Sequence, residues 1–140
     1  MTTTTLSYQT TTDGLSADQL TGEFFQGWPN PPSPETHLRI LEGSDHKVLA
    51  VREGQVIGFI TAISDGVLSA FITLLEVVPD EQGKGIGQSL MTQLLEDIGD
   101  IYMVDLMCHA NFSRFYAELG FATSTGMSRR DYAMQAGRPA

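Results

Sequence analysis

The sequence predicts a single domain of the α+β class, with mixed α/β structure, over residues 1–140. Three observations favour this class: short amphipathic stretches come first, strand-like segments joined by turn signals follow, and strands then alternate with helices. A chain of this length can bury one hydrophobic core of its own. We therefore expect a central sheet with flanking helices.

The first third of the chain contains one candidate strand and two candidate short helices. Residues 4–10 are typical of a strand, and Ser16 is a suitable N-cap for the short amphipathic helix expected after it. Four of the six prolines lie within residues 29–34, which predicts a stiff loop rather than regular structure. Ser33 then caps a second helix, with Pro34 in the first helical position that proline favours.

Three strands are expected in the middle of the chain, over residues 46–52, 55–64 and 68–78. The pairs Glu53-Gly54 and Asp65-Gly66 are turn signals between them, and Pro79 closes the third strand. The short connections favour a meander of neighbouring antiparallel strands.

The last third of the chain alternates between helical and extended patterns. Apolar residues recur at every fourth position over residues 87–98, which predicts an amphipathic helix. Residues 101–108 are almost continuously apolar, which predicts a strand buried on both faces. A short helix over residues 111–119 and closing strands over residues 121–123 and 127–133 complete the expected order.

Composition and charge exclude several classes of function. The net charge of −9 argues against general binding of nucleic acid, because contacts to phosphates need a basic face. No apolar run approaches the roughly 20 residues of a membrane helix, and the first ten residues lack the features of a signal peptide. The single cysteine excludes an internal disulfide framework, and no residue cluster indicates a metal site. We expect a cytoplasmic protein without a membrane or nucleic-acid partner.

A glycine-rich loop precedes the predicted helix at residues 87–98, in the stretch Gln82-Gly83-Lys84-Gly85-Ile86-Gly87. Glycines take positive φ readily and have no side chain, so successive N–H groups can point into one concavity. The helix start adds unpaired N–H groups and a positive dipole end, and Lys84 adds a full charge. The stretch matches neither a P-loop nor the dinucleotide fingerprint G-x-G-x-x-G. It predicts a site for a phosphorylated ligand of another kind.

This loop resembles the Gln/Arg-x-x-Gly-x-Gly/Ala signature of the GNAT superfamily, the N-acetyltransferases that use acetyl-coenzyme A (acetyl-CoA). Residues 75–80, Leu-Glu-Val-Val-Pro-Asp, resemble the central strand of that family and its proline exit. Residues 115–121, Phe-Tyr-Ala-Glu-Leu-Gly-Phe, resemble a second family element, and the spacing between the two matches suits one helix plus one strand. The resemblance covers about residues 68–121, and the first third of the chain agrees only in element order.

The resemblance implies a GNAT-like N-acyltransferase fold, with a central mixed, mostly antiparallel sheet of six to seven strands and about four flanking helices. The sheet would splay in the middle, and the pantetheine arm of acetyl-CoA would pair there with the backbone around Val77 and Val78. The pyrophosphate would lie on Gln82, Gly83, Lys84, Gly85, Ile86 and Gly87. Acetyl-CoA is thus the implied co-substrate, and no metal is implied.

The resemblance further implies direct attack of an amine on the thioester, with Tyr116 as the general acid toward the leaving thiolate. A core tyrosine with its hydroxyl at the surface is the alternative for Tyr116. Glu76 is a candidate base, because a carboxylate at the end of an apolar strand can have a pKa raised by burial. Asp105, His109 and bound water are alternative bases, and His109 stands where the family often has asparagine.

The predicted function is that of an acyltransferase, an N-acetyltransferase acting on a primary amine of a small molecule or peptide. A catalytically silent acyl-CoA-binding module that senses or regulates is one alternative, and transfer of a longer acyl group is another. Phe24, Phe25 and Trp28 are candidates for an aromatic wall beside the amine, for a packed lid or for a dimer surface. Family members often dimerise, so a homodimer is left open.

Overall fold

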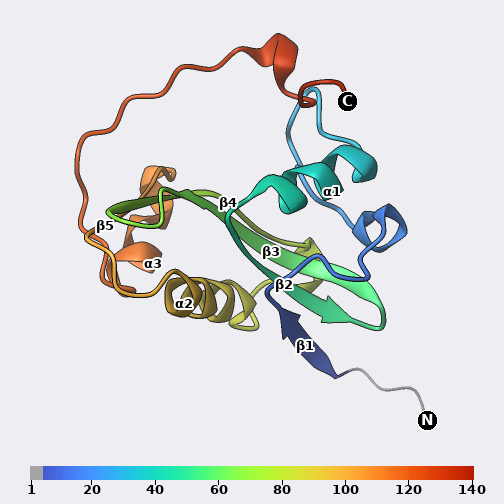
Figure 1. The fold of residues 1–140 in the computed structure, drawn as a ribbon, viewed down its shortest axis with the longest axis horizontal. Coiled ribbons are helices and arrows are strands. Elements are labelled where there is room, and N and C mark those ends of the chain that lie inside the picture. Colours follow the sequence, from blue (N-terminus) through green and yellow to red (C-terminus); the bar gives the residue numbers. More distant parts are fainter. Residues whose placement is uncertain (1–4) are drawn as a thin grey trace.

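A five-stranded mixed sheet forms the centre of the computed structural model, which describes residues 5–140 (Figure 1). The strands lie side by side in sequence order, as β1 Leu6–Gln9, β2 His46–Arg52, β3 Gln55–Ser64, β4 Ser69–Val77 and β5 Met103–Leu106. Neighbours run antiparallel except β4 and β5, which run parallel. A parallel pair needs a crossover, and helix α2, Ile86–Ile98, supplies it. The predicted α+β class is confirmed.

The early elements follow the sequence signals closely. β2 and β3 have the predicted bounds, β4 is one residue shorter at each end, and helix α1 spans Pro34–Gly43. The Ser33 hydroxyl oxygen accepts a hydrogen bond of 3.1 Å from the Thr36 N–H, which satisfies an otherwise unpaired donor of the first turn. The strand expected at residues 4–10 is β1, and residue 4 lies outside the described residues.

Hydrophobic clusters cover both faces of the sheet, because neighbouring side chains of a strand point to opposite faces. On one face α2 packs through Leu90, Met91 and Leu94, which are fully buried. On the other face α1 and the segment after β1 pack around Phe59 and Leu41. Figure 1 shows α1 and α2 on opposite sides of the sheet. Burial contributes about 1.5–3 kcal/mol for each large apolar side chain, so both layers hold the sheet.

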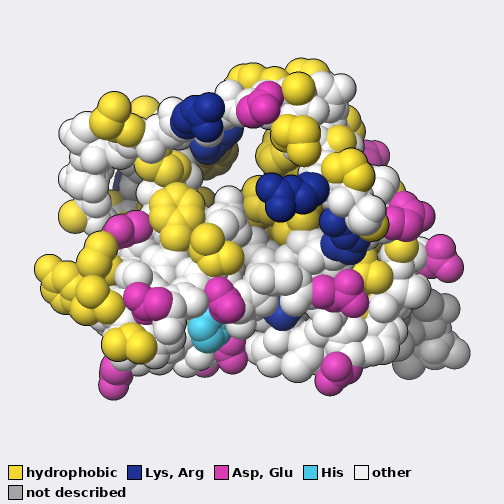
Figure 2. Space-filling model, turned by 45° about the horizontal axis from the view of Figure 1, so that its top comes forward, with side chains coloured by type: hydrophobic (Ala, Val, Ile, Leu, Met, Phe, Trp, Pro, Cys, Tyr) yellow, Lys and Arg dark blue, Asp and Glu magenta, His cyan; other side chains and the backbone are white. Residues whose placement is uncertain are grey.

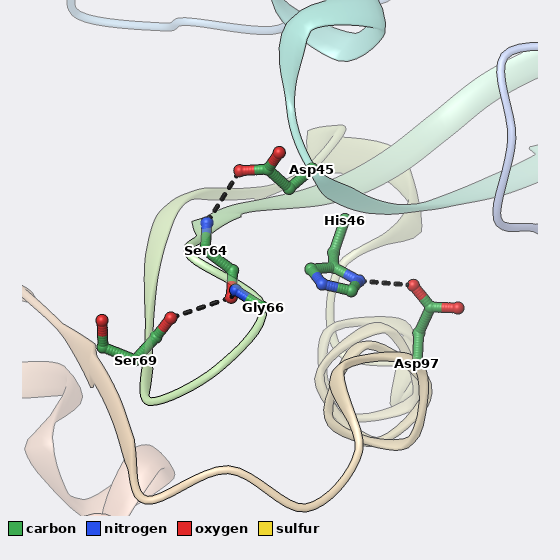
Figure 3. A network of polar contacts seen from close by, with 6 residues as sticks. All are labelled: Asp45, His46, Ser64, Gly66, Ser69 and Asp97. Atoms are coloured by element: carbon green, nitrogen blue, oxygen red, sulfur yellow. Dashed lines mark hydrogen bonds and ion pairs between the residues drawn. The ribbon is translucent and has the colours of Figure 1, made fainter.

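Polar contacts tether the end of α2 and the β3–β4 turn. His46 Nδ1 lies 2.8 Å from Asp97 Oδ2, which joins β2 to the last turn of α2 (Figure 3). In the turn, the Ser64 N–H donates to Asp45 Oδ2 at 2.7 Å, and the Ser64 hydroxyl donates to the Ser69 carbonyl at 2.8 Å. Because α2 is fixed at this end and along its buried face, its first turn is held beside the glycine-rich loop.

The sheet has five strands within the described residues, not six to seven, and three α-helices accompany it, not about four. The strands expected at residues 121–123 and 127–133 are not formed, and the second range holds only part of a single 3₁₀ turn, Tyr132–Met134. A strand needs a neighbouring edge, and this segment runs in a wide arc away from the sheet (Figure 1).

Two further expectations are wrong. The helix expected after Ser16 is one 3₁₀ turn, Ala17–Leu20, and it is followed by a tight turn in which Phe25 has a φ of +59° and its carbonyl accepts from the Trp28 N–H at 3.2 Å. β5 is short, and Met103 and Met107 are 37% and 47% exposed rather than buried, because they lie on the face opposite Val104 and Leu106, the face that packs against the core. The last predicted helix appears as a 3₁₀ turn, Ala110–Phe112, followed by α3, Ser113–Ala117. Within residues 5–140, no helix combines the length and apolar character needed to cross a bilayer.

Candidate active site

The parallel pair of β4 and β5 opens into a cleft along the second half of β4. Their pairing covers only residues 69–72 and 103–106, so residues 73–77 of β4 have no described strand on that side. A cleft of about 720 Å³ lies here, lined by Glu23, Gln26, Trp28, Leu75, Glu76, Val77, Glu81, Gln82, Gly83, Gly85, Ile86, Gly87, Gln88, His109, Phe112, Phe115 and Tyr116. The structure thus has an open wedge where the sequence predicts that the sheet splays.

The glycine-rich loop has the backbone conformation that its sequence suggests. Gly83 and Gly85 have φ of +77° and +82°, which glycine adopts without strain. Gly85 is the N-cap of α2, and the first turn of α2 carries no acidic residue. Its unpaired N–H groups and positive dipole end are therefore not neutralised from within the helix. The loop can hold an anionic group, as a phosphate site requires.

Side chains before the loop fix its position. The Gln82 side-chain amide donates a hydrogen bond of 2.9 Å to the Val77 carbonyl, which ties the loop to the end of β4. Glu81 accepts from Lys84 Nζ at 3.1 Å and from Arg52 Nε at 3.0 Å. The hydrogen bond from Lys84 lowers the pKa of Glu81, and Arg52 adds to the effect. Glu81 therefore stays ionised and links the loop to β2.

Two of the predicted binding residues do not line the cleft. Lys84 is paired with Glu81, and its side chain is 55% exposed. The Val78 N–H donates to the Ile57 carbonyl at 2.9 Å, so it is already used within the fold. The predicted residues that do line the cleft are Val77, Gln82, Gly83, Gly85, Ile86 and Gly87. The loop therefore offers backbone groups rather than the lysine charge.

Tyr116 contributes to the cleft wall from α3. Its ring packs against Phe115 and Phe121, at centroid distances of 5.0 and 6.1 Å. Burial raises the pKa of the Tyr116 hydroxyl, with a smaller contribution from Cys108. The hydroxyl makes no hydrogen bond with any described residue. Tyr116 is therefore a half-buried, protonated phenol that is available to donate, as a general acid must be.

Glu76 contributes to the cleft wall from β4, where it lies opposite Phe59. Its Oε1 accepts a hydrogen bond of 2.7 Å from the backbone N–H of Phe25. Burial raises the pKa of the Glu76 carboxyl, and the Phe25 hydrogen bond opposes that shift. Glu76 thus has the raised pKa expected of a base, together with a structural role in holding the segment around Phe25.

The alternative base candidates are placed differently. His109 lines the cleft at the residue before the 3₁₀ turn Ala110–Phe112. Asp105 is exposed on β5 and does not line the cleft. Cys108 is exposed as well. Of these three, only His109 is positioned to act there. Among residues 5–140, no group of three or more His, Cys, Asp or Glu could hold a metal ion.

Some cleft residues carry no sequence signal. Glu23 and Gln26 lie beside Trp28 in the wall, and the Gln26 amide donates to Glu23 Oε2 at 2.9 Å. Trp28 is where an aromatic wall is expected, but Phe24 and Phe25 pack in the core instead. The sequence around Glu23 and Gln26 has a helix-like pattern, which gives no sign that their side chains line a cleft. In the structure, the turn at Phe25 lies between them. Two other cleft residues do have a signal in the sequence. Gln88 lies in the predicted helix directly after the glycine-rich loop, and Phe115 belongs to the second family motif; both line the cleft.

Comparisons with known proteins agree with this geometry. A family model described as an acetyltransferase (GNAT) domain matches residues 16–133. The GCN5-related N-acetyltransferase 1, chloroplastic, of Arabidopsis thaliana is 30% identical over 118 residues, which are 81% of this chain and 59% of that protein. An uncharacterised N-acetyltransferase of Gracilaria tenuistipitata var. liui is 37% identical over 70 residues, 49% of this chain and 38% of that protein. The chain therefore spans 59% or less of the length of these two curated relatives.

Solved structures extend the likeness to the whole chain. The crystal structure of an acetyltransferase-like protein from Deinococcus radiodurans R1 is 47% identical, with a TM-score of 0.94 over 100% of both chains. A GNAT-family acetyltransferase from Streptococcus pneumoniae TIGR4 is 28% identical, with a TM-score of 0.68 over 92% of this chain and 98% of that chain.

Proposed function

The chain belongs to the GNAT acetyltransferase family, and from this premise we propose that it transfers an acetyl group from acetyl-CoA to a primary amine. One observation carries the proposal: a single cleft beside the second half of β4 combines a glycine-rich helix start with a protonated, unpaired tyrosine hydroxyl. The first feature suits a pyrophosphate, and the second suits protonation of a leaving group.

The residues of the cleft fit acetyl-CoA in size and chemistry. A volume of about 720 Å³ lies within the roughly 300–1,000 Å³ typical of small-molecule sites. The unpaired side of residues 73–77 offers backbone groups to an extended ligand, as an added strand would use them. Gly83, Gly85 and the first turn of α2 would hold the pyrophosphate. A smaller hollow that shares Gly85 continues along the exposed side of α2.

When bound, acetyl-CoA supplies a thioester whose carbonyl carbon the amine nitrogen attacks. Glu76 takes the amine proton, directly or through water, and its raised pKa makes it a stronger base than an exposed carboxylate. Tyr116 donates its proton to the sulfur as the C–S bond breaks, and its raised pKa keeps it protonated until then. The N–C bond forms as the C–S bond breaks in this series of steps, so the products are an acetylated amine and free coenzyme A.

The acceptor end of the cleft favours a cationic amine. Glu23 and Glu76 place two carboxyl groups in the wall, and Trp28 adds an aromatic surface on which a cation can rest. The net negative charge of the chain also attracts cations. The Tyr116 hydroxyl in the cleft wall, which burial keeps protonated, supports catalysis over the silent acyl-CoA-binding module.

Two measurements test the proposal in order. Calorimetric titration with acetyl-CoA and with free coenzyme A is expected to show binding of both, because the loop contacts are common to the two ligands. Release of free thiol is then followed with acetyl-CoA and a panel of primary amines, with tertiary amines as the control. Binding without thiol release on any primary amine would favour the silent module, and absence of binding would contradict the cofactor assignment.

A further inference from the structure

The carboxylates that line the cleft differ in their partners. They are Glu23, Glu76 and Glu81, and no described lysine or arginine lines the cleft beside them. Glu81 forms ion pairs with one arginine and one lysine, and Glu76 accepts a hydrogen bond of 2.7 Å from a backbone N–H. Among the described residues the Glu23 carboxylate has only a neutral partner, the Gln26 amide, at 2.9 Å. Glu23 can therefore take a cation from a ligand as its charged partner.

The wall around Glu23 is fixed by local contacts. The Gln26 amide donates to Oε2 of Glu23, which leaves Oε1 for another partner. The Trp28 N–H donates to the Phe25 carbonyl at 3.2 Å, and the two rings lie 5.0 Å apart between centroids. Because the Phe25 side chain is buried, it anchors the half-buried Trp28 ring beside the cleft. The wall thus presents a carboxylate and an aromatic face in a set position.

The hydrogen bond between Phe25 and Glu76 sets the distance between the two carboxylates of the acceptor end. The Phe25 nitrogen lies 2.7 Å from Glu76 Oε1, and Glu23 precedes Phe25 by two residues. Two residues of extended chain span about 7 Å at most, so the Glu23 Cα lies within about 10 Å of the Glu76 carboxylate. A ligand with a spacer of a few carbon atoms can therefore contact both glutamates at once.

The chemistry of the reaction separates the tasks of the two carboxylates. The reacting amine must lose its proton before its nitrogen attacks, so its own charge is not kept through the reaction. An ammonium group elsewhere on the acceptor stays charged throughout. Such a group suits both the Glu23 carboxylate and the face of Trp28, since aromatic faces attract cations. A carboxylate in the same place on the acceptor would be repelled, so this wall selects among amines by the group remote from the reacting nitrogen.

We propose that the acceptor is a diamine: one amino group reacts beside Glu76, and the second, as an ammonium ion, is bound by Glu23 and Trp28. The inference rests on the proposed acetyl transfer and makes Glu23 a residue that determines specificity. The covalent step is unchanged, because the N–C bond forms, the C–S bond breaks and the second ammonium group keeps its proton. The products are a diamine acetylated on one nitrogen and free coenzyme A.

The charge of the whole chain also favours a dication. The net charge is −9, and Figure 2 shows acidic side chains spread over the body, with lysine and arginine mainly around the opening in the upper part of that view. A negative field attracts a dication more strongly than a monocation and repels an amino acid through its carboxylate. Because this attraction acts on the whole surface, a test must show that the preference depends on Glu23.

Trp28 fluorescence measures acceptor binding without catalysis, because Trp28 is the only tryptophan and lines the cleft. Three probes share a primary amine and a four-carbon spacer: 1,4-diaminobutane ends in an ammonium group, pentylamine in a methyl group and 5-aminopentanoate in a carboxylate. Each is titrated with free coenzyme A present. Diaminobutane is expected to bind about tenfold more tightly than pentylamine, the combined effect of an exposed ion pair and a cation–π contact. Aminopentanoate is expected to bind most weakly.

Variants of Glu23 assign the preference to one side chain. Glu23→Gln keeps an oxygen for the Gln26 amide but removes the charge, so affinity for diaminobutane should fall about fivefold while that for pentylamine stays the same. Glu23→Lys should reverse the order, so that aminopentanoate binds more tightly than diaminobutane. Glu42→Gln removes the same charge at an exposed position of α1 outside the cleft, and as the matched control it should keep the wild-type order. Because Glu23 is exposed, its variants should retain the far-UV circular dichroism of the wild type.

Thiol release with the same amines gives a second, kinetic test. Glu23 binds the remote ammonium group equally before and during the reaction, so Glu23→Gln should raise KM for diaminobutane and leave kcat unchanged. A KM that does not change, with both amines acetylated, would contradict the diamine inference and leave acetyl transfer standing.

The titrations decide the matter even if no amine is acetylated. Equal affinities of the wild type for the three probes, no response of Trp28 to diaminobutane, or the same preference in Glu23→Gln would each overturn the inference. A preference for diaminobutane that is lost in Glu23→Gln would support the cation site, and failure of acetyl-CoA to bind in the same protein would then contradict acetyl transfer alone.

Discussion

The carboxylate of Glu76 accepts a hydrogen bond of 2.7 Å from the backbone N–H of Phe25, a residue with a φ of +59°. A left-handed conformation is uncommon for a bulky residue and costs of order 1 kcal/mol or more. The hydrogen bond and the burial of the Phe25 ring offset that cost. The same turn brings Glu23 and Gln26 to the cleft, so Glu76 shapes the acceptor wall as well as offering a base.

Glu76→Gln separates these two roles. Glutamine still provides an oxygen to accept from Phe25, so the melting temperature should change little. It cannot take a proton, so turnover near neutral pH should fall by about 10²-fold, the lower end of what a general base contributes. Steady-state kinetics with acetyl-CoA and an active amine measure the effect.

Glu76→Ala is the companion variant for Glu76→Gln. It removes the acceptor as well and leaves a half-buried N–H unpaired, which should lower stability by about 1–3 kcal/mol. Normal turnover in Glu76→Gln would assign the proton to water or to His109 instead.

Tyr116→Phe tests the general acid. The variant keeps the ring contacts with Phe115 and Phe121, so affinity for acetyl-CoA should be nearly unchanged while kcat falls by about 10²-fold. Burial raises the pKa of Tyr116, so the wild type should keep its acid form up to a pH above the ordinary tyrosine value of 10.0. Tyr8→Phe, outside the cleft, is the matched control. Equal kcat in wild type and Tyr116→Phe would remove Tyr116 as the acid.

Gly85→Glu tests the glycine-rich loop. A side chain there adds strain, because φ is +82°, and places a negative charge where the pyrophosphate is proposed to lie. Calorimetry should show loss of acetyl-CoA binding. Gly66→Glu is a matched control, because Gly66 has a φ of +74°, has open space around its Cβ position and does not line the cleft. If both variants bind acetyl-CoA as the wild type does, the loop is not the phosphate site.

The sequence predicts the part of this fold that is specified by local signals. The turn at Gly54 and the cap at Ser33 fix the bounds of β2, β3 and α1 almost to the residue. The glycine loop and Tyr116 also meet in one cleft as expected, because the strand–loop–helix order that joins them is short in sequence. Long-range geometry is a different matter: nothing local to Glu81 shows that Arg52, 29 residues away, will pair with it.

The errors lie where a contact between distant segments decides the structure. Glu23 and Gln26 reach the cleft on either side of the turn at Phe25, and Glu76, 51 residues away, accepts a hydrogen bond from the Phe25 N–H. The closing strands fail for a related reason. Residues 127–133 have a strand pattern, but a pattern does not provide an edge, and no edge of the described chain reaches them.

Because the side chain of His37 is buried, we expect the folded protein to lose stability in mild acid. It is 1% exposed and is surrounded by the rings of Phe24, Phe25 and Phe59, at centroid distances of 5.2, 5.0 and 4.5 Å. Its Nε2 has no hydrogen-bond partner among the described residues, and burial lowers its pKa from 6.5 to about 4. The unfolded chain therefore binds this proton before the folded chain does.

Stability should accordingly fall as the pH drops from about 6.5 towards 4, with a total loss of about 3 kcal/mol once the pH is below both pKa values. At pH 5 the expected loss from this one residue is about 2 kcal/mol. Urea unfolding of the wild type and of His37→Leu at pH 7 and pH 5 measures it. Leucine fills a similar volume without a proton site, so the variant should lose less between the two pH values, and groups common to both proteins cancel. An equal loss in both would mean that His37 is not the residue that titrates.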